Sequence, residues 1–416
     1  MTANNKNGHL IPFILVTSLF FLWAFVHNLE PILIPHLKKA CQLTDLQSAL
    51  IDSAVYIGYL LMALPAGYVM KRYGYKRGII TGLVLYAVGA LLFFPAADSR
   101  VYGFFLAALF IIASGCAFLE TAANPYVTIL GDPATANTRL NFAQSFNGFG
   151  AFIAPYAGGL WILSGVEHSD DALAAMAPEQ LQQYLQTEAD AVKIPYLVIA
   201  GVVLLVALLV WITRMPEASA ESSGKPTSIG KALRHPQLKW GVVAQFFYVG
   251  AQVCVTSFFI RFARFTSDTP EKEAAFWLSM AMLGFMLGRF FGTWISRYIA
   301  ANRLLALYAG ACMVLLALAT FVRSDIAIWA LLVVPFFESI LFPTIFALSI
   351  DGIGEDTEIG SSLVVMAIAG GAVFPLAMGL ISDQSNIQLA YIVPLLCFAV
   401  VAWYGLRGYR KLTTDH

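Results

Sequence analysis

Charged residues are scarce in this chain of 416 residues, where only 12% of the positions are Asp, Glu, Lys or Arg. Soluble domains average about 25% charged residues, whereas 59% of this chain is hydrophobic. The composition therefore excludes an ordinary soluble protein and indicates a polytopic membrane protein that contacts a lipid bilayer. Basic and acidic residues both number 25, so the net charge indicates no nucleic-acid partner and we expect none.

Clustered cysteines and catalytic motifs are also missing. The five cysteines lie far apart and form no CxxC or Cys/His cluster, so the sequence predicts neither a disulfide framework nor a metal site. No P-loop, dinucleotide-binding glycine run, zinc motif or nucleophile elbow is present. We therefore expect no enzymatic activity, no cofactor and no ATP hydrolysis within this chain.

Long apolar runs make up most of the sequence. A run of about 20 apolar residues crosses a hydrocarbon core about 30 Å thick. We expect the first run, Leu10 to Val26, to stay as a helix, because no small-residue cleavage site closes it. The sequence predicts an all-α integral membrane protein with twelve spans, at 10–34, 47–70, 78–97, 101–130, 140–163, 194–213, 239–262, 274–296, 303–322, 326–350, 361–382 and 389–407.

The polar stretches between the spans predict the domain organisation. A segment rich in Ser, Pro, Gly and basic residues separates spans six and seven, which predicts an N-terminal half at 1–213, a cytoplasmic linker at 214–238 and a C-terminal half at 239–416. A polar stretch at 166–191 reads as an external loop with a short helix around Pro178–Ala189. With both termini in the cytoplasm, the internal segments carry 16 Lys and Arg residues and the external ones 8, in agreement with the positive-inside rule.

A repeated pattern connects the two halves. Glu120 precedes Pro125 by five residues in one apolar run, and Glu338 precedes Pro343 in the same way 218 residues later. Two further pairs occur in the same order, namely Gly67–Arg72 with Gly292–Arg297, and Gly150–Ala151 with Gly371–Ala372. An ionisable side chain at the centre of a span costs about 2.5–3.5 kcal/mol and usually marks a substrate or proton path. Duplicated halves with an acid in each indicate a transporter.

Polar side chains recur at helical spacing within several spans. Glu120 and Asn124 are four residues apart and share one face of span four. Two similar rows are Asn141, Gln144 and Asn147 in span five, and Gln245, Gln252 and Thr256 in span seven. Amides and carboxylates beside aromatic rings suit a polyhydroxylated ligand. A single amide could equally join two helices, a bond worth about 0.6–2 kcal/mol, but three rows together favour a ligand cavity.

Several ionisable residues are candidates for proton coupling. His27 and Glu30 share one face of span one and can exchange a proton, or they satisfy each other near a water-exposed end. Asp52 either lies within the membrane or caps its helix near the external surface. Glu338 is supported by the repeat, although its phenylalanine neighbours also fit a structural or gating role. Burial disfavours ionisation of a carboxyl group, so embedded acids can bind and release protons near neutral pH.

Several motifs resemble known sequences. The segment Gly67-x4-Arg72-x-Gly74-x-Lys76-Arg77 resembles the loop signature of the major facilitator superfamily, except that Lys71 stands where the family pattern has an acid. Further segments resemble the L-fucose/proton symporter family, namely Phe20–Ala24, Ser53–Tyr59, Leu119–Pro125, Arg139–Asn147, Gly250–Gln252, Ile260–Arg261 and Pro343–Phe346. Together these matches run over nearly the whole chain.

The resemblance implies twelve helices, alternating access and the coupling of sugar uptake to protons. It assigns the embedded glutamate of the family to Glu120 and its substrate-contacting amides to Gln144 and Asn147. The first-helix aspartate of the family aligns with Pro31, so Glu30 can substitute only if its side chain is re-aimed, because one residue rotates a side chain by about 100°. The acids Asp52 and Glu338 also depart from the family pattern, which leaves open a sugar other than L-fucose.

These observations predict a monomeric sugar/proton symporter of the bacterial inner membrane, driven by the proton gradient. We expect Glu120 to couple sugar binding to protonation, with Glu30, His27, Asp52 and Glu338 as further proton-coupling candidates. The expected substrate-binding residues are Glu120, Asn124, Gln144, Asn147, Asn28 and Gln252. The expected monosaccharide is L-fucose or a related hexose. The alternatives are a different hexose, such as glucose, galactose or mannose, or a drug or metabolite exported by the same fold.

Overall fold

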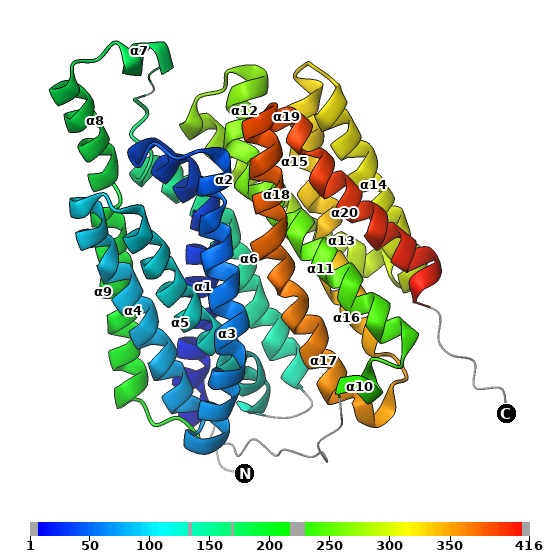
Figure 1. The fold of residues 1–416 in the computed structure, drawn as a ribbon. Helices are drawn as coiled ribbons and strands as arrows, with labels where there is room; N and C mark the ends of the chain where they lie inside the picture. Colours follow the sequence, from blue (N-terminus) through cyan, green and yellow to red (C-terminus); the bar gives the residue numbers. More distant parts are fainter. Residues whose placement is uncertain (1–6, 132–134, 167, 169, 217–228, 410–416) are drawn as a thin grey trace. The chain divides into compact units, whose positions relative to one another are not determined.

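The computed structural model describes residues 7–131, 135–166, 168, 170–216 and 229–409 of the chain, and all regular secondary structure in these residues is helical (Figure 1). Within this part, eleven helical segments are long and apolar enough to cross a membrane. A further long helix, α6 (Ala136–Trp161), has 26 residues and falls outside that group. It carries the amide row of Asn141, Gln144 and Asn147. The predicted all-α fold with twelve membrane-spanning helices is confirmed.

The chain divides by its internal contacts into two units. Unit 1 contains residues 1–43 and 54–221, and unit 2 contains residues 44–53 and 222–416. The predicted linker at 214–238 lies partly outside the described residues, and the predicted boundaries of the two halves remain a prediction. The short segment Thr44–Ser53 belongs to unit 2 by its contacts, although the chain on both sides of it belongs to unit 1.

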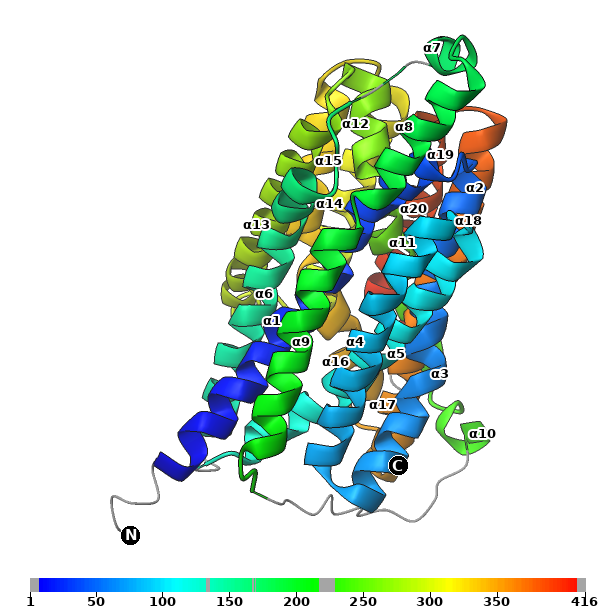
Figure 2. The ribbon, with the colours of Figure 1, turned by 90° about the vertical axis from the view of Figure 1, so that its left-hand side faces the viewer.

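Unit 1 is built from six long helices and two short ones. They are α1 (Asn7–Ala40), α3 (Leu50–Tyr73, whose first turn belongs to unit 2), α4 (Tyr75–Ser99), α5 (Tyr102–Ile129), α6 (Ala136–Trp161), α7 (Asp170–Ala174), α8 (Pro178–Asp190) and α9 (Lys193–Ile212). The helix predicted around Pro178–Ala189 is confirmed as α8. Figure 2 shows α9 running beside α4, and α4 in turn packs against α5, while α1 packs against α6.

Small residues bring α4 and α5 into close contact. A Cβ atom built on Gly115 of α5 would lie 2.5 Å from the carbonyl oxygen of Gly82, and one built on Gly82 would lie 2.8 Å from the carbonyl oxygen of Gly115. Small residues allow the close backbone approach that stabilises helix pairs in membranes, where apolar side chains gain little by leaving lipid. These two glycines therefore set the distance between α4 and α5.

Unit 2 repeats this architecture with more interruptions. It contains α2 (Asp45–Ser48), α10 (Ile229–Ala232), α11 (Pro236–Ser257), α12 (Phe259–Ser267), α13 (Glu271–Ile295), α14 (Ala301–Phe321), α15 (Ile326–Glu338), α16 (Leu341–Ile350), α17 (Thr357–Met366), α18 (Gly370–Gln384), α19 (Ile387–Ala390) and α20 (Ile392–Trp403). Short 3₁₀ segments at Gly354–Asp356 and Ala367–Ala369 and a π segment at Tyr404–Gly408 complete it. In Figure 1, α11 and α18 run side by side, and α14 packs against α15 and α20.

The two units share one packing pattern. In unit 1, a Cβ on Gly150 of α6 would lie 2.8 Å from the carbonyl oxygen of Phe21 on α1. In unit 2, a Cβ on Gly370 of α18 would overlap the carbonyl oxygen of Phe246 on α11. The α4–α5 pair of unit 1 likewise has a counterpart in the α14–α15 pair of unit 2. The repeat found in the sequence is therefore also a repeat of helix contacts.

The two Glu/Pro stretches differ in local structure. Helix α5 runs without interruption through Glu120 and Pro125. The predicted span at 326–350 is instead divided, since α15 ends at Glu338 and α16 begins at Leu341. Proline lacks an N–H group and is tolerated in the first turn of a helix, which is where Pro343 lies in α16. The duplicated motif therefore has a continuous helix in one half and a broken helix in the other.

We predict that the Gly115→Ala variant is less stable than the wild-type protein, because the added methyl group has no space against the α4 backbone. Overpacking of this kind costs about 1–3 kcal/mol. The matched control is Gly103→Ala in the same helix, where a Cβ has no neighbour within 4 Å. The measurement is the thermal unfolding midpoint of the purified protein in detergent. Equal midpoints for the two variants would contradict this account of the α4–α5 contact.

Candidate functional site

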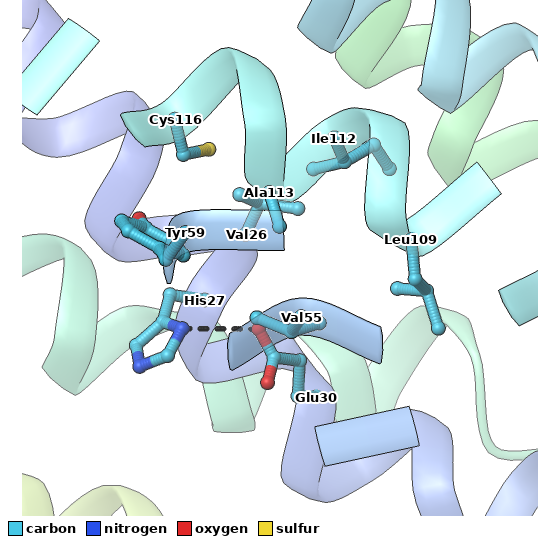
Figure 3. Close-up of a pocket in the computed structure, with 9 residues that line it drawn as sticks. All are labelled: Val26, His27, Glu30, Val55, Tyr59, Leu109, Ile112, Ala113 and Cys116. Atoms are coloured by element: carbon cyan, nitrogen blue, oxygen red, sulfur yellow. Dashed lines mark hydrogen bonds and ion pairs between the residues drawn. The ribbon is translucent and has the colours of Figure 1, made fainter. Parts of the chain in front are cut away.

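A pocket in unit 1 contains His27 and Glu30 of α1. Helices α1, α3 and α5 supply its walls, and Figure 3 shows the side chains around it. The residues that line it are Val26, His27, Glu30, Val55, Tyr59, Leu109, Ile112, Ala113 and Cys116. Most of this lining is apolar, so the few polar groups in it determine what the pocket can bind or transfer.

His27 connects an acid to a phenol. Its Nδ1 atom lies 3.0 Å from Oε1 of Glu30, and its Nε2 atom lies 3.2 Å from the hydroxyl oxygen of Tyr56 on α3. The contact predicted from the spacing of His27 and Glu30 is therefore confirmed. The side chain of Glu30 is 8% exposed and that of His27 is 35% exposed. Because an imidazole can accept a proton at one nitrogen and release one from the other, this row can relay a proton between the Glu30 carboxyl group and the Tyr56 hydroxyl group.

Tyr59 and Cys116 complete the pocket. The Tyr59 ring meets the His27 ring edge-on at 6.2 Å between centroids, and Cys116 lines the pocket from α5. Tyr59 is also within electrostatic reach of Glu30 and Glu120. Tyr56, Tyr59 and Cys116 are site residues that the sequence did not predict. The available signal was the three-residue spacing of the two tyrosines, which places them on one face of span two.

A second polar group joins α5 to α6. The Asn124 side chain donates a hydrogen bond of 3.0 Å to the backbone oxygen of Glu120, and Gln144 donates one of 3.2 Å to the Asn124 side-chain oxygen. The Glu120 side chain is exposed and lies within electrostatic reach of His27. The structure therefore brings Glu120, Asn124 and Gln144 together and connects them to the α1 pocket.

The other predicted substrate residues are less tightly placed. Asn147 lies three residues beyond Gln144 on α6 and is half-buried. Asn28 donates a hydrogen bond of 2.8 Å to the backbone oxygen of Ala24, so its amide nitrogen already has a hydrogen-bond acceptor within its own helix. Gln252 is half-buried on α11 and belongs to unit 2. Asp52 and Glu338 also belong to unit 2, and both are fully buried.

Asp52 lies in a polar network that holds the segment Thr44–Ser53 on unit 2. Its Oδ1 atom accepts a hydrogen bond of 2.8 Å from the hydroxyl group of Ser257. Arg261 forms an ion pair of 2.6 Å with Asp45. The carboxyl group of Asp383 accepts hydrogen bonds from the backbone N–H groups of Asp45 and Leu46 at 2.7 and 2.9 Å. Asp52 is therefore at the edge of an anchoring network, and a role in proton coupling remains a prediction.

The sequence of this chain matches a known family of membrane transporters. Residues 15–367 match the Major Facilitator Superfamily. The chain is 45% identical to the L-fucose-proton symporter of Escherichia coli (strain K12), over 96% of this chain and 93% of that protein. It is 41% identical to a glucose/galactose transporter of Brucella abortus, over 95% and 93% of the two chains.

Solved structures agree with these matches. FucP, a Major Facilitator Superfamily transporter solved in the outward conformation, has a TM-score of 0.69 and 45% identity, covering 96% of this chain and 99% of that one. A D-xylose-proton symporter has a TM-score of 0.73 at 12% identity, covering 96% and 98%, which shows the fold alone. The chain therefore belongs to the Major Facilitator Superfamily of membrane transporters, and within it to the family of the L-fucose–proton symporter. It is a multi-pass membrane transporter and not an enzyme, as predicted.

We predict that Arg261→Gln destabilises the protein strongly, because it leaves the carboxyl group of Asp45 without its cation. Breaking a buried ion pair by removing one partner costs about 3–5 kcal/mol, and the Arg261 side chain is only 9% exposed. Lys231→Gln is the control, since that side chain is 59% exposed and its ion pair is longer. Thermal unfolding midpoints test this. A double variant, Asp45→Asn with Arg261→Gln, should lose less than the sum of the two single losses, and strict additivity would contradict the assigned pairing.

Proposed function

We propose that this protein is a proton-coupled symporter that imports L-fucose or a closely related hexose by alternating access. The observation that carries the proposal is the arrangement of Glu120, Asn124 and Gln144 beside the row of Glu30, His27 and Tyr56. One acid, Glu120, thereby lies beside the amides that would bind a polyhydroxylated ligand and within electrostatic reach of His27 in the proton relay. The names of the relatives, a fucose–proton symporter and a glucose/galactose transporter, support the same conclusion.

In this proposal, the side-chain amides and the carboxyl group of the site bind the hydroxyl groups of the sugar. Amide and carboxyl groups can each engage two neighbouring hydroxyl groups of a sugar, and aromatic rings such as that of Tyr59 can cover its apolar C–H surface. We assign Glu120, Asn124 and Gln144 to this task because they already form a connected polar surface. Asn147, Asn28 and Gln252 are assigned to the same task as further contacts.

Glu120 is the residue that couples the sugar to the proton. Protonation removes the charge of its carboxyl group, which lowers the cost of enclosing the site away from water. A proton that moves through about 100 mV supplies roughly 2.3 kcal/mol, enough for about a 40- to 50-fold sugar gradient. Glu30 and His27 accept the proton from the external side in this scheme, with Tyr56 on the second ring nitrogen of His27.

Glu30 can replace the first-helix aspartate that the family resemblance implies at Pro31. Helix α1 continues through Pro31, and the Glu30 carboxyl group is directed to His27 within the pocket (Figure 3). The contact with His27 thus re-aims an acid that stands one position away from the expected one. This supports Glu30 as an acid of the coupling mechanism.

Glucose or galactose is the second candidate substrate, because a relative that is 41% identical to this chain carries that name. The sequence supports a proposal for the oligomeric state, the location and the energy source. We propose that the protein is a monomer of the bacterial inner membrane with both termini in the cytoplasm. The proton gradient is its energy source, and no cofactor takes part.

We predict that Glu120→Gln abolishes sugar accumulation driven by an external acid pulse in proteoliposomes. Exchange of labelled for unlabelled sugar across the membrane should persist, because glutamine resembles the protonated acid in shape and hydrogen bonding. Glu179→Gln, which neutralises an exposed acid on α8 of the same unit, is the control and should accumulate sugar normally. Undiminished acid-driven accumulation by Glu120→Gln would remove this residue from the coupling mechanism.

Competition will identify the sugar. Uptake of labelled L-fucose should be inhibited most strongly by unlabelled L-fucose, and less by glucose, galactose and mannose, at two external pH values. Uptake should be faster at the lower pH because the proton is a co-substrate. Stronger inhibition by glucose or galactose than by L-fucose would assign the protein to the second candidate substrate. Inhibition by none of these sugars would contradict hexose transport.

A further inference from the structure

An acid in the core of unit 2 has no polar partner. The side chain of Glu338 is 0% exposed, and neither of its carboxyl oxygens has a hydrogen-bond partner among the described residues. An ionised carboxylate in such a place costs several kcal/mol or more, and even lenient scales assign about 2.5–3.5 kcal/mol at the centre of a span. The fold therefore holds a group that requires a ligand to be stable there.

Glu338 lies at the interruption between α15 and α16. Its backbone oxygen accepts a hydrogen bond of 2.9 Å from the hydroxyl group of Tyr248 on α11. The neighbouring Ser339 hydroxyl group bonds back to the oxygen of Phe336 at 2.7 Å. The backbone oxygens of Glu338 and Phe336 thus have hydrogen-bond donors at the helix break, whereas the Glu338 carboxyl group has no partner among the described residues. Interrupted helices in transporters commonly form ion sites.

None of the ionisable groups around Glu338 neutralises it in the described structure. Tyr248 bonds to its backbone rather than its carboxyl group, and the Cys312 thiol on α14 is directed at the oxygen of Val334. The guanidinium of Arg289 on α13 lies over the Phe285 ring, 4.9 Å from its centroid, and its Nε atom has no hydrogen-bond partner among the described residues. Two further ionisable groups, those of Cys254 and Tyr391, lie within electrostatic reach of Glu338, and the Tyr308 ring packs against the neighbouring Phe337.

A second unpartnered polar side chain faces the same helices. Gln245 on α11 is 0% exposed, and within the described part of the chain both polar atoms of its amide lack hydrogen-bond partners. It lies on the helical face shared by Gly241, which meets Ser349 of α16, and Tyr248, which meets Glu338. The carboxyl group and the amide therefore belong to one interface, between α11 and the α15–α16 pair.

We propose that Glu338 is a proton-binding site of unit 2, separate from the acids of unit 1. Its carboxyl group holds a proton in this state and releases it once in each transport cycle. A proton is the ligand that fits best, because it converts the carboxylate to a neutral acid without further ligands, whereas an alkali cation requires several oxygens around it. This inference rests on the proposed proton-coupled transport and adds a second proton to it.

Two measurements test the proposal. Infrared difference spectra of the purified protein should show a protonated carboxyl band that is lost in Glu338→Gln and retained in Glu273→Gln, which removes an exposed acid of the same unit. In proteoliposomes, the number of protons taken up per sugar should fall by about half in Glu338→Gln, since one of two proton carriers is gone. If the glutamine variant does not fold, Glu338→Asp serves instead, because a shorter acid shifts the band and does not remove it.

Results that contradict the proposed role of Glu338 differ from those that contradict the proposed transport function. A carboxyl band that persists unchanged in Glu338→Gln, or an equal proton-to-sugar ratio in both proteins, overturns the inference. Sodium-stimulated uptake that is lost in Glu338→Gln assigns the carboxyl group to an alkali cation and also overturns it. If the proposed function fails instead, the wild-type protein takes up no protons with sugar, although the band is still lost in Glu338→Gln. If only this inference fails, the wild type and the variant take up protons at the same ratio.

Discussion

Hydrocarbon offers no hydrogen-bond partner, so each polar group of a membrane protein must find one within the protein. The described residues follow this constraint at the backbone, which is helical over most of each span and is interrupted in the span at 326–350 between α15 and α16. Two buried hydroxyl groups show the same behaviour: Ser114 bonds to the oxygen of Phe110 in its own helix, and Tyr86 bonds to the oxygen of Leu22 on α1. A buried polar group without a hydrogen-bond partner is therefore a candidate site for a ligand that supplies the missing interaction.

The acids show how the two units use one architecture differently. Glu30 is paired with His27, and Glu120 lies exposed beside an amide row on a continuous helix. Glu338 occupies the equivalent repeat position in unit 2, yet it is fully buried at a helix break. Duplication thus conserved the helix contacts while the environments of the two glutamates diverged. In the proposed scheme, the unit 1 acid contacts the sugar, whereas the unit 2 acid only carries a proton.

The departures from the family pattern have a physical meaning in this arrangement. Pro31 replaces an expected acid, but Glu30 reaches His27 on the same helix, so a proton acceptor is kept in the first helix. Asp52 is not isolated, since it accepts a hydrogen bond from Ser257 within the network around Asp45 and Arg261. Among these departures, only Glu338 places an ionisable group in an apolar core, and this is the reason for proposing it as a proton-binding site.

The sequence by itself determined the all-helical membrane fold, because apolar runs of span length permit little else, and it placed His27 with Glu30 and Glu120 with Asn124 through helical periodicity. Tertiary structure decided what periodicity cannot encode, namely which faces meet across helices. It joined Gln144 to Asn124, added Tyr56 and Tyr59 to the pocket, and attached the segment Thr44–Ser53 to unit 2. It also made Glu120 accessible and Glu338 buried, since burial depends on the neighbouring helices and not on the local motif that the two glutamates share.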